Sequence, residues 1–130
     1  MVDVTGKSIF LSGPMTGIKN NNVAAFCDAQ ATLYQMGAAN VYNPAYQWLQ
    51  SGCPTDKPHE YWMVGCINEL TAHDILNRKP KYDMVLTLCG SEDSIGALTE
   101  KSVARACGIP VYEFGTSSQL WSANKDVISD

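Results

Sequence analysis

The sequence predicts a single-domain α/β fold, a parallel sheet with helices on both faces of the Rossmann-like or flavodoxin-like kind. Short apolar runs alternate with segments of helical periodicity, and Gly or Pro residues separate them. The length of 130 residues suits one domain, with its core over about 8–114 and a C-terminal tail over 115–130. Ligands of such folds bind beyond the carboxyl ends of the strands, so the loops that follow strands are expected to hold the functional residues.

The first strand and the first helix are marked by their ends. The apolar run 8–12 is expected to be a buried strand, because Gly13-Pro14 closes it. After a loop, Asn22 is expected to cap a helix whose apolar residues recur at helical spacing. Gly37 is placed to end that helix in a left-handed turn.

The middle of the chain predicts a strand, a long loop and a helix. Residues 41–42 form a short strand that Asn43-Pro44 stops. The segment 45–60 has Gly and Pro residues with no clear period, so we expect it to be mainly loop, and long loops are often functional. A second helix is expected from Tyr61 to about Leu76.

The last third of the chain gives the strongest strand signal, the apolar run 84–88. A loop rich in Gly, Ser and Asp follows, then a third helix from about Ile95 to Cys107 and a last strand over 110–114. The tail is polar apart from a few apolar residues, and we expect it to hold a short helix or to dock on a neighbouring molecule.

Composition and charge exclude several classes of protein. A chain that is 45% hydrophobic and 17% charged can bury a core, so disorder is not expected. Nine basic and thirteen acidic side chains give a net charge of -4 with no basic run, which disfavours a duplex-DNA partner. No apolar stretch approaches the roughly 20 residues of a membrane span, and the N-terminus lacks the pattern of a signal peptide. A soluble, cytoplasmic protein is expected.

The five cysteines are odd in number, scattered and without a C-x-x-C pair. This disfavours a disulfide framework and a structural zinc site. Cys27, Cys66 and Cys107 each fall within a helical pattern and are expected to be small core residues. The two histidines, His59 and His73, have no acidic cluster beside them, so neither a histidine metal site nor a Ser-His-Asp triad is expected.

Glu100 is the residue that a structural role explains least well. On a helical wheel it falls inside the apolar stripe of the third helix, formed by Ala97, Val103, Ala104 and Cys107. A carboxylate there is partly desolvated, which raises its pKa and is costly unless the group is paired or used in catalysis. Two structural alternatives are that Glu100 turns outward at the helix edge or accepts a hydrogen bond from a neighbouring helix.

The loop before this helix has the features of an anion site. Ser94 and the backbone N–H groups near Ile95 and Gly96 are placed at a helix N-terminus, where free donors and partial positive charge gather. Gly96 would allow a phosphate to approach the backbone closely. The alternative is that Ser94 is only an N-cap.

The remaining motifs exclude two cofactor chemistries and leave one open question. The loop 12–17 lacks the G-x-x-x-x-G-K-[ST] spacing, which disfavours an ATPase, and no G-x-G-x-x-G fingerprint supports nicotinamide binding. Six aromatic residues could stack on a nucleobase, although such residues more often belong to a core or an interface. They are Trp48, Trp62, Trp121, Tyr42, Tyr46 and Tyr61.

Four motifs in order resemble the nucleoside 2-deoxyribosyltransferase superfamily over about Ile9–Tyr112. They are F-L-S-G-P-M-T-G at 10–17, V-Y-N-P at 41–44, D-M-V-L at 83–86, and S-I-G-A-L-T-E at 94–100 with G-I-P-V at 108–111. The chain is most similar to the small, often phage-encoded branch with an S-G-P-M-T-G opening. It shares S-x-G-x-x-x-E with the nucleoside 5'-monophosphate N-glycosidases.

The resemblance implies a covalent glycosidic mechanism with Glu100 as the nucleophile on the anomeric carbon. It implies that Ser94 and Gly96 hold a 5'-phosphate, with further phosphate and sugar contacts from Ser12, Gly13, Met15, Thr16 and Gly17. No metal or organic cofactor is implied. The expected partner is a small nucleotide substrate, and a homo-oligomer, a dimer or larger, is expected.

Two departures from the family pattern concern catalysis. Phe10 stands where many members have a tyrosine that positions the nucleophile, and Cys66 stands where many have an aspartate that assists leaving-group protonation. Phe10 and Cys66, with the nearby Asn68 and Glu69, are therefore possible sugar or leaving-group contacts. The first expectation is hydrolysis of a (deoxy)nucleoside 5'-monophosphate to base and sugar phosphate. The alternatives are a nucleoside 2-deoxyribosyltransferase that exchanges bases and a non-catalytic nucleotide-binding protein.

Overall fold

A computed structural model describes residues 3–15, 18–74, 76, 78–88, 94–114 and 120–122. Its main sheet has five strands in the order β2-β1-β5-β6-β7. These are β1 Ser8–Ser12, β2 Asn40–Tyr42, β5 Met84–Thr87, β6 Val111–Phe114 and β7 Leu120–Ser122. The first four strands in this order pair in parallel, and β7 is antiparallel to β6. The parallel sheet with helices around it confirms the predicted Rossmann-like α/β fold.

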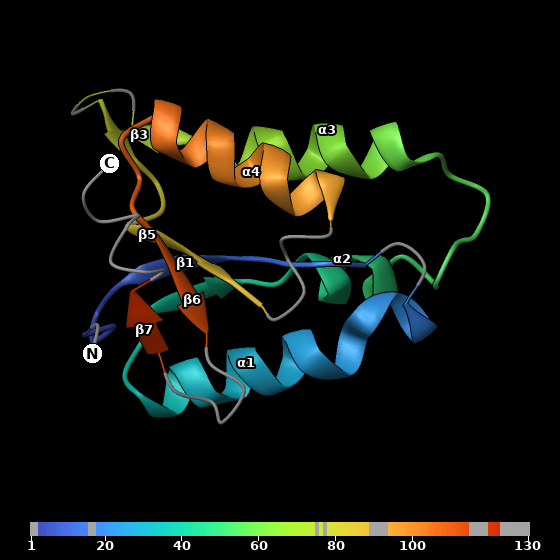
Figure 1. Ribbon diagram of the computed structural model, residues 1–130, viewed down its shortest axis with the longest axis horizontal. Helices are drawn as coiled ribbons and strands as arrows, with labels where there is room; N and C mark the ends of the chain where they lie inside the picture. The colour runs from blue at the N-terminus through green and yellow to red at the C-terminus, as the bar shows by residue number, and fades with distance from the viewer. Residues whose placement is uncertain are drawn as a thin grey trace.

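The helices lie in two layers (Figure 1). Helices α1 (Val23–Gln35) and α2 (Pro44–Gln50) lie together on one side of the sheet, and α3 (His59–Leu70) and α4 (Ile95–Ala106) lie together on the other. The chain moves from β1 to one neighbour, β2, and later returns to the other neighbour, β5. Because crossovers share one hand, this reversal puts α1, which joins β1 to β2, and α4, which joins β5 to β6, on opposite faces and leaves a crevice at the carboxyl ends of β1 and β5.

Strand β1 shows how the core sets the position of one polar residue. Ile9 and Leu11 belong to the apolar cluster that contains Phe26 of α1, whereas Phe10 belongs to the cluster on the α3 and α4 side. Side chains of a strand alternate between the two faces of a sheet. Ser12 lies two residues after Phe10, so its hydroxyl faces α4.

The start of α1 differs from the prediction. The side chain of Asn22 makes no capping hydrogen bond, so the predicted cap is wrong. Instead its Nδ2 donates to the carbonyl of Pro14 at 3.0 Å, which ties the loop after β1 to the helix. A 3₁₀ turn, η1 (Lys19–Asn22), precedes α1, and Asn20 and Asn21 have φ of 51° and 52°. Asparagine tolerates this left-handed conformation better than most residues.

The segment predicted as one long loop, 45–60, is wrong in its first half, because α2 begins at Pro44. The Asn43 side chain caps this helix by accepting a hydrogen bond from the Tyr46 N–H at 3.0 Å. Asparagine at the N-cap and proline in the first turn are both favourable helix starts. The Asn-Pro pair therefore ends β2 and begins α2.

Helix α3 begins two residues earlier than predicted and ends at Leu70 instead of near Leu76. The Thr71 hydroxyl donates to the carbonyl of Ile67 at 2.7 Å where the helix ends. A small antiparallel pair follows, formed by β3 (His73–Asp74) and β4 (Lys79–Pro80). The Asp74 carboxylate accepts the Leu76 N–H at 3.0 Å within the connecting turn. These local polar contacts compete with helix continuation.

The last elements agree with the prediction up to β6, and the tail differs. Helix α4 and strand β6 occupy the predicted segments within two residues. In the tail, residues 120–122 form β7 and pair with β6, so a short helix at this position is wrong. Residues 115–119 and 123–130 lie outside the described residues. Within the described part of the chain, no helix is both long enough and apolar enough to cross a membrane.

Candidate active site

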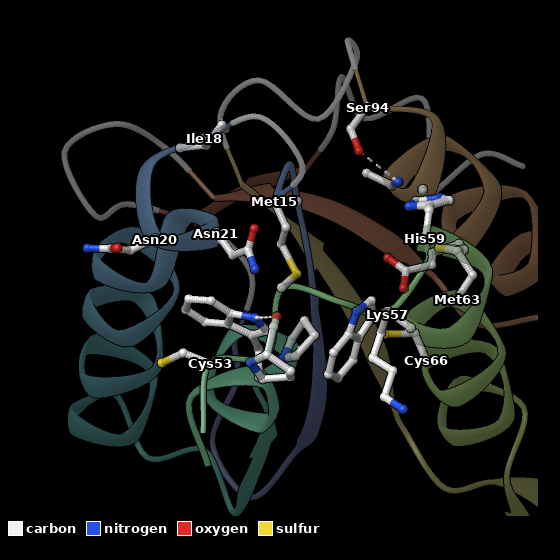
Figure 2. Close-up of a pocket in the computed structure, with 18 of the residues that line it drawn as sticks. Met15, Ile18, Asn20, Asn21, Cys53, Lys57, His59, Met63, Cys66 and Ser94 are labelled. Carbon is white, nitrogen blue, oxygen red and sulfur yellow. Dashed lines mark hydrogen bonds between the residues drawn. The ribbon is translucent and has the colours of Figure 1, made fainter. Parts of the chain in front are cut away.

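A cavity of about 590 Å³ lies beyond the carboxyl ends of the parallel strands. Segments far apart in the sequence form its wall: the loop after β1, helix α2, helix α3 and the start of α4 (Figure 2). The residues on which the site depends are Gly13, Met15, Trp48, Trp62, Cys66, Ser94, Gly96 and Glu100. The cavity therefore occupies the place where the fold predicts a ligand.

Glu100 is a buried carboxyl group on the cavity wall, with 5% of its surface exposed. The Ser12 hydroxyl donates to its Oε1 at 2.6 Å. Cys66 of α3 lines the same cavity. The predicted burial is thus confirmed, and the alternative of an outward-turned side chain is wrong. The hydrogen bond to this carboxylate from Ser12 comes from the last residue of strand β1, whereas the other alternative expected one from a helix.

The surroundings of Glu100 act on its pKa in opposite directions. Burial is the largest effect and raises the pKa of Glu100, the hydrogen bond from Ser12 lowers it, and the net pKa is about 7. Burial disfavours the charged form, and donors aimed at a carboxylate favour it. A carboxyl group with a pKa near 7 is present in both forms at neutral pH, which suits it to chemistry at that pH.

Cys66 and Tyr42 lie close enough to Glu100 for its charge to act on both groups. Burial, together with that charge, raises the pKa of the Cys66 thiol to about 12, so the thiol keeps its proton at neutral pH. Burial raises the pKa of Tyr42 as well. Cys66 packs against the core cluster on the α3 and α4 side, as expected of a small core residue, and it also lines the cavity.

Phe10 does not reach the cavity. It is fully buried and lies opposite Tyr42 in the β1–β2 register. The two rings stack with centroids 5.0 Å apart, and Tyr82 packs edge-on against Phe10 at 5.6 Å. Phe10 therefore supports the Tyr42 ring from the next strand.

Ser94 and Gly96 both line the cavity at the N-terminus of α4. The Ser94 Oγ accepts the Ala97 N–H at 3.2 Å, so Ser94 does cap the helix. A Cβ on Gly96 would lie 3.2 Å from Met63 Sδ and 3.5 Å from His59 Cε1. A side chain at position 96 would therefore need Met63 to move by a few tenths of an ångström, and the phosphate role of both residues stays a prediction.

The loop after β1 contributes Gly13 and Met15 to the cavity. A Cβ on Gly13 would lie 3.0 Å from Leu88 Cβ, so the close pairing of β1 with the end of β5 requires glycine here. The Leu88 N–H donates to the Ser12 carbonyl at 2.8 Å, which continues that pairing. The predicted contacts Thr16 and Gly17 lie outside the described residues.

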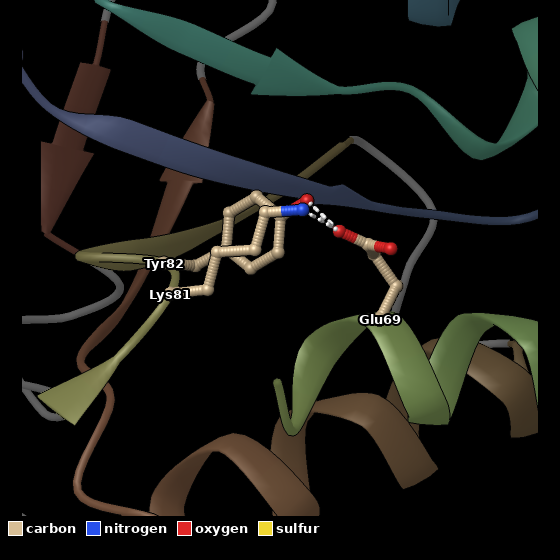
Figure 3. A network of polar contacts seen from close by, with 3 residues as sticks. All are labelled: Glu69, Lys81 and Tyr82. Carbon is tan, nitrogen blue, oxygen red and sulfur yellow. Dashed lines mark hydrogen bonds and ion pairs between the residues drawn. The ribbon is translucent and has the colours of Figure 1, made fainter. Parts of the chain in front are cut away.

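Asn68 and Glu69 do not line the cavity. Asn68 is exposed. The Glu69 carboxylate accepts hydrogen bonds from the Lys81 ammonium and the Tyr82 hydroxyl (Figure 3). This network fastens the end of α3 to the segment before β5. Of the residues near the expected leaving-group position, the structure brings only Cys66 to the cavity.

Other lining residues come from the segment whose structure was predicted incorrectly. Trp48 is 9% exposed and donates its Nε1–H to the Pro54 carbonyl at 2.9 Å, and Trp62 is half-buried. Both were among the aromatic residues weighed for base stacking. Lys57, His59 and Met63 also line the cavity and were missed. His59 was placed before the predicted helix, which was expected to start only at Tyr61.

Three of the other aromatic residues lie elsewhere. Tyr46 and Tyr61 are exposed and absent from the cavity wall, and the Trp121 side chain lies outside the described residues. Across the described residues, no group of three or more His, Cys, Asp or Glu side chains is arranged to hold a metal ion.

The comparisons with known proteins give one family. Residues 7–113 match the domain of unknown function DUF4406. No curated protein and no solved structure matches the chain. The matched segment includes the parallel strands, β6 up to Glu113, and all the residues that line the cavity. The chain therefore belongs to the DUF4406 family.

Proposed function

We propose that this protein hydrolyses the N-glycosidic bond of a (deoxy)nucleoside 5'-monophosphate with Glu100 as the nucleophile. The observation that carries the proposal is a buried carboxyl group, Glu100, which accepts a hydrogen bond from Ser12 on the wall of a cavity at the sheet's switch point. The resemblance of the chain to nucleoside 2-deoxyribosyltransferases supports the same assignment.

The reaction proceeds in two displacements at the anomeric carbon. The Glu100 carboxylate attacks C1' as the C1'–N bond breaks, and the base leaves with the bonding electron pair and takes up a proton. Water then attacks C1' of the glycosyl ester, which releases the sugar phosphate, a proton and the free carboxylate. The transition states resemble an oxocarbenium ion, which a nearby carboxylate stabilises as a charge and then captures.

The other walls of the cavity fit the two ends of such a substrate. Trp48 and Trp62 offer flat apolar surface to a nucleobase. The N-terminus of α4, with Ser94, offers N–H groups and partial positive charge to a phosphate. Glu100 follows Ser94 by about one and a half helical turns, roughly 9 Å along the axis, which leaves room for a sugar between phosphate and nucleophile. The volume of about 590 Å³ is within the usual range for small-ligand pockets.

The test is chromatographic detection of free base after incubation with nucleoside monophosphates and with the matching nucleosides, each with and without an acceptor base. Glu100→Gln is measured beside the native protein, and Glu60→Gln, a change of an exposed carboxylate outside the cavity, is the control. We expect base release from monophosphates that is lost only in Glu100→Gln. Undiminished release by that variant would overturn the proposal.

Two outcomes would select the alternatives. Base exchange that requires an acceptor would identify a deoxyribosyltransferase. A nucleotide that raises the melting temperature and is recovered intact would identify a binding protein, because a ligand bound only by the native state stabilises it. The family resemblance also implies a homo-oligomer, and light scattering after size exclusion tests that expectation.

A further inference from the structure

We infer that Asn21 is a positioning residue that fixes the Trp48 ring as the wall against which the nucleobase lies. Asn21 belongs to η1 and Trp48 to α2, and both residues line the cavity. The place of a nucleobase on this wall rests on the proposed function, whereas the contact between the two side chains rests on their geometry.

The indole N–H of Trp48 joins three segments of the cavity wall. Its Nε1 donates to the carbonyl of Pro54, in the segment after α2, at 2.9 Å. The same Nε1 donates to the side-chain oxygen of Asn21 at 3.2 Å, with the amide oriented so that both of its ends have a partner. An N–H group shared between two acceptors is a common arrangement. The two acceptors together fix the orientation of the Trp48 ring.

The other end of the Asn21 amide holds the loop after β1. In the same orientation, its Nδ2 donates to the carbonyl of Met15 at 3.3 Å. Figure 2 shows the Asn21 side chain beside Met15, whereas the side chain of the neighbouring Asn20 points away from Met15. One amide group therefore connects the loop after β1 with the aromatic ring on α2.

The backbone that presents this amide is left-handed over three successive residues. Asn20, Asn21 and Asn22 have φ of 51°, 52° and 64°, a region that residues other than glycine normally enter singly. Two hydrogen bonds hold the turn: the Asn21 N–H donates to the carbonyl of Ile18 at 2.9 Å, and Asn22 Nδ2 donates to that of Pro14 at 3.0 Å. Such strain persists only where the surroundings fix it, and it gathers at binding sites. The turn therefore accepts a conformational cost and presents the Asn21 amide to the cavity.

Three variants separate the amide from the strained backbone. Glycine adopts the left-handed conformation readily, so Asn21→Gly keeps the turn and removes only the amide. Asn20→Gly makes the same backbone change one residue earlier and keeps the Asn21 amide, so it is the matched control. Asn21→Asp also tolerates the left-handed φ. It keeps an acceptor for the Trp48 indole and loses the donor to Met15.

The test is the hydrogen-exchange rate of the Trp48 indole N–H, measured by NMR in ¹⁵N-labelled protein without substrate. The Trp48 signal is assigned by its absence in Trp48→Phe. We expect Asn21→Gly to raise the exchange rate roughly fivefold, because one of the two hydrogen bonds that protect this proton is lost. The rate should stay at the native value in Asn20→Gly and close to it in Asn21→Asp, whose carboxylate still accepts the indole N–H.

The consequence for the substrate is measured separately, as the KM and kcat of base release from a nucleoside monophosphate. Asn21→Gly should raise KM roughly fivefold and leave kcat unchanged, because the lost contact orients the wall for the base and does not touch Glu100. A destabilised protein with fewer active molecules would instead show a lower kcat at the native KM.

Three results of the exchange experiment would overturn the role of Asn21: an unchanged rate in Asn21→Gly, an equal rise in Asn20→Gly, or a rise in Asn21→Asp as large as in Asn21→Gly. Faster exchange with an unchanged KM would also overturn it, because the base would then not lie against Trp48. Since exchange needs no turnover, the two proposals fail separately. The predicted exchange rates in a protein that releases no base would refute the proposed function alone.

Discussion

The Ser12 hydroxyl donates a 2.6 Å hydrogen bond to Oε1 of Glu100, a residue 88 positions later in the sequence. The bond joins the last residue of β1 to the second turn of α4. The alternation of side chains along β1 turns Ser12 toward α4, and burial of the opposite residues, Ile9 and Leu11, fixes that alternation. The packing that forms the core therefore also fixes the position of the carboxylate.

Ser12→Ala should shift the acidic limb of the profile of kcat/KM against pH to higher pH. The lost hydrogen bond favoured the carboxylate, so its removal raises the pKa of Glu100 above about 7. We expect activity to fall roughly tenfold at pH 7 and to recover toward pH 9, as measured by kcat/KM for base release.

The control for Ser12 is Thr87→Val. Thr87 is a buried hydroxyl residue paired with Ser12 in the β1–β5 register, and its Oγ1 donates to the Tyr112 carbonyl instead of Glu100. Thr87→Val should lower the stability of the protein without shifting the acidic limb of the profile of kcat/KM against pH. If the acidic limb of the Ser12→Ala profile stays at the same pH, the Ser12–Glu100 hydrogen bond does not lower the pKa of Glu100.

Glu100 should make the protein less stable as the pH rises from about 4.5 to 7. Its pKa is raised from 4.5 to about 7 in the folded state, so in this interval the folded state binds the proton more tightly than the unfolded state. The stabilisation from this group is complete below about pH 4.5 and is lost as the pH passes the folded pKa. The difference in pKa corresponds to roughly 3 kcal/mol.

Thermal melts of Glu100→Gln test this dependence. The neutral amide does not titrate, so the variant should melt above the native protein at pH 8 and close to it at pH 5. Equal melting-temperature differences at the two pH values would show that Glu100 has an ordinary pKa in the folded protein.

Two glycine-to-alanine changes should have opposite effects on stability. Gly13→Ala places a Cβ 3.0 Å from Leu88 Cβ. Because the Leu88 Cβ is fixed to the backbone and cannot rotate away, the change should lower the free energy of unfolding by about 1–3 kcal/mol. Gly65→Ala places a Cβ in open space within α3 and should add about 0.5–1 kcal/mol. Urea unfolding midpoints measure both. A neutral result for Gly13→Ala would contradict the tight pairing of β1 with the end of β5.

Trp62→Ala should weaken nucleotide binding, because the indole lines the cavity where a base would lie. Stacking of one base on an aromatic ring contributes about 1–3 kcal/mol, so we expect Kd to rise roughly tenfold or more. Calorimetry with a nucleoside monophosphate, in the Glu100→Gln background to prevent turnover, measures the change. Tyr46→Ala removes an exposed aromatic ring outside the cavity and should leave Kd unchanged.

The fold and the burial of Glu100 could be predicted because both depend on periodicity within single segments. The apolar run 84–88 and the stripe around Glu100 needed no knowledge of distant residues. The start of α2 was missed because Asn43-Pro44 both ends a strand and begins a helix, and only the strand end was considered. Polar contacts between local groups likewise ended α3 at Leu70, before its apolar pattern ran out.

The partners of Glu100 could not be predicted from the sequence. Ser12 comes from strand β1 and Cys66 from helix α3, and their placement near Glu100 depends on strand order and helix packing. The sequence pattern marked Cys66 only as a departure from a family aspartate.

The central claim is that Glu100 forms a covalent bond with the sugar. Its most direct test is mass spectrometry of peptides after incubation with a 2'-fluoro nucleoside monophosphate, whose electronegative substituent slows breakdown of the intermediate. The account predicts that the peptide containing Glu100 gains the mass of the fluorinated sugar phosphate, and that Glu100→Gln gains none. Release of base with the adduct on a different peptide, or release that continues undiminished in Glu100→Gln, would contradict it.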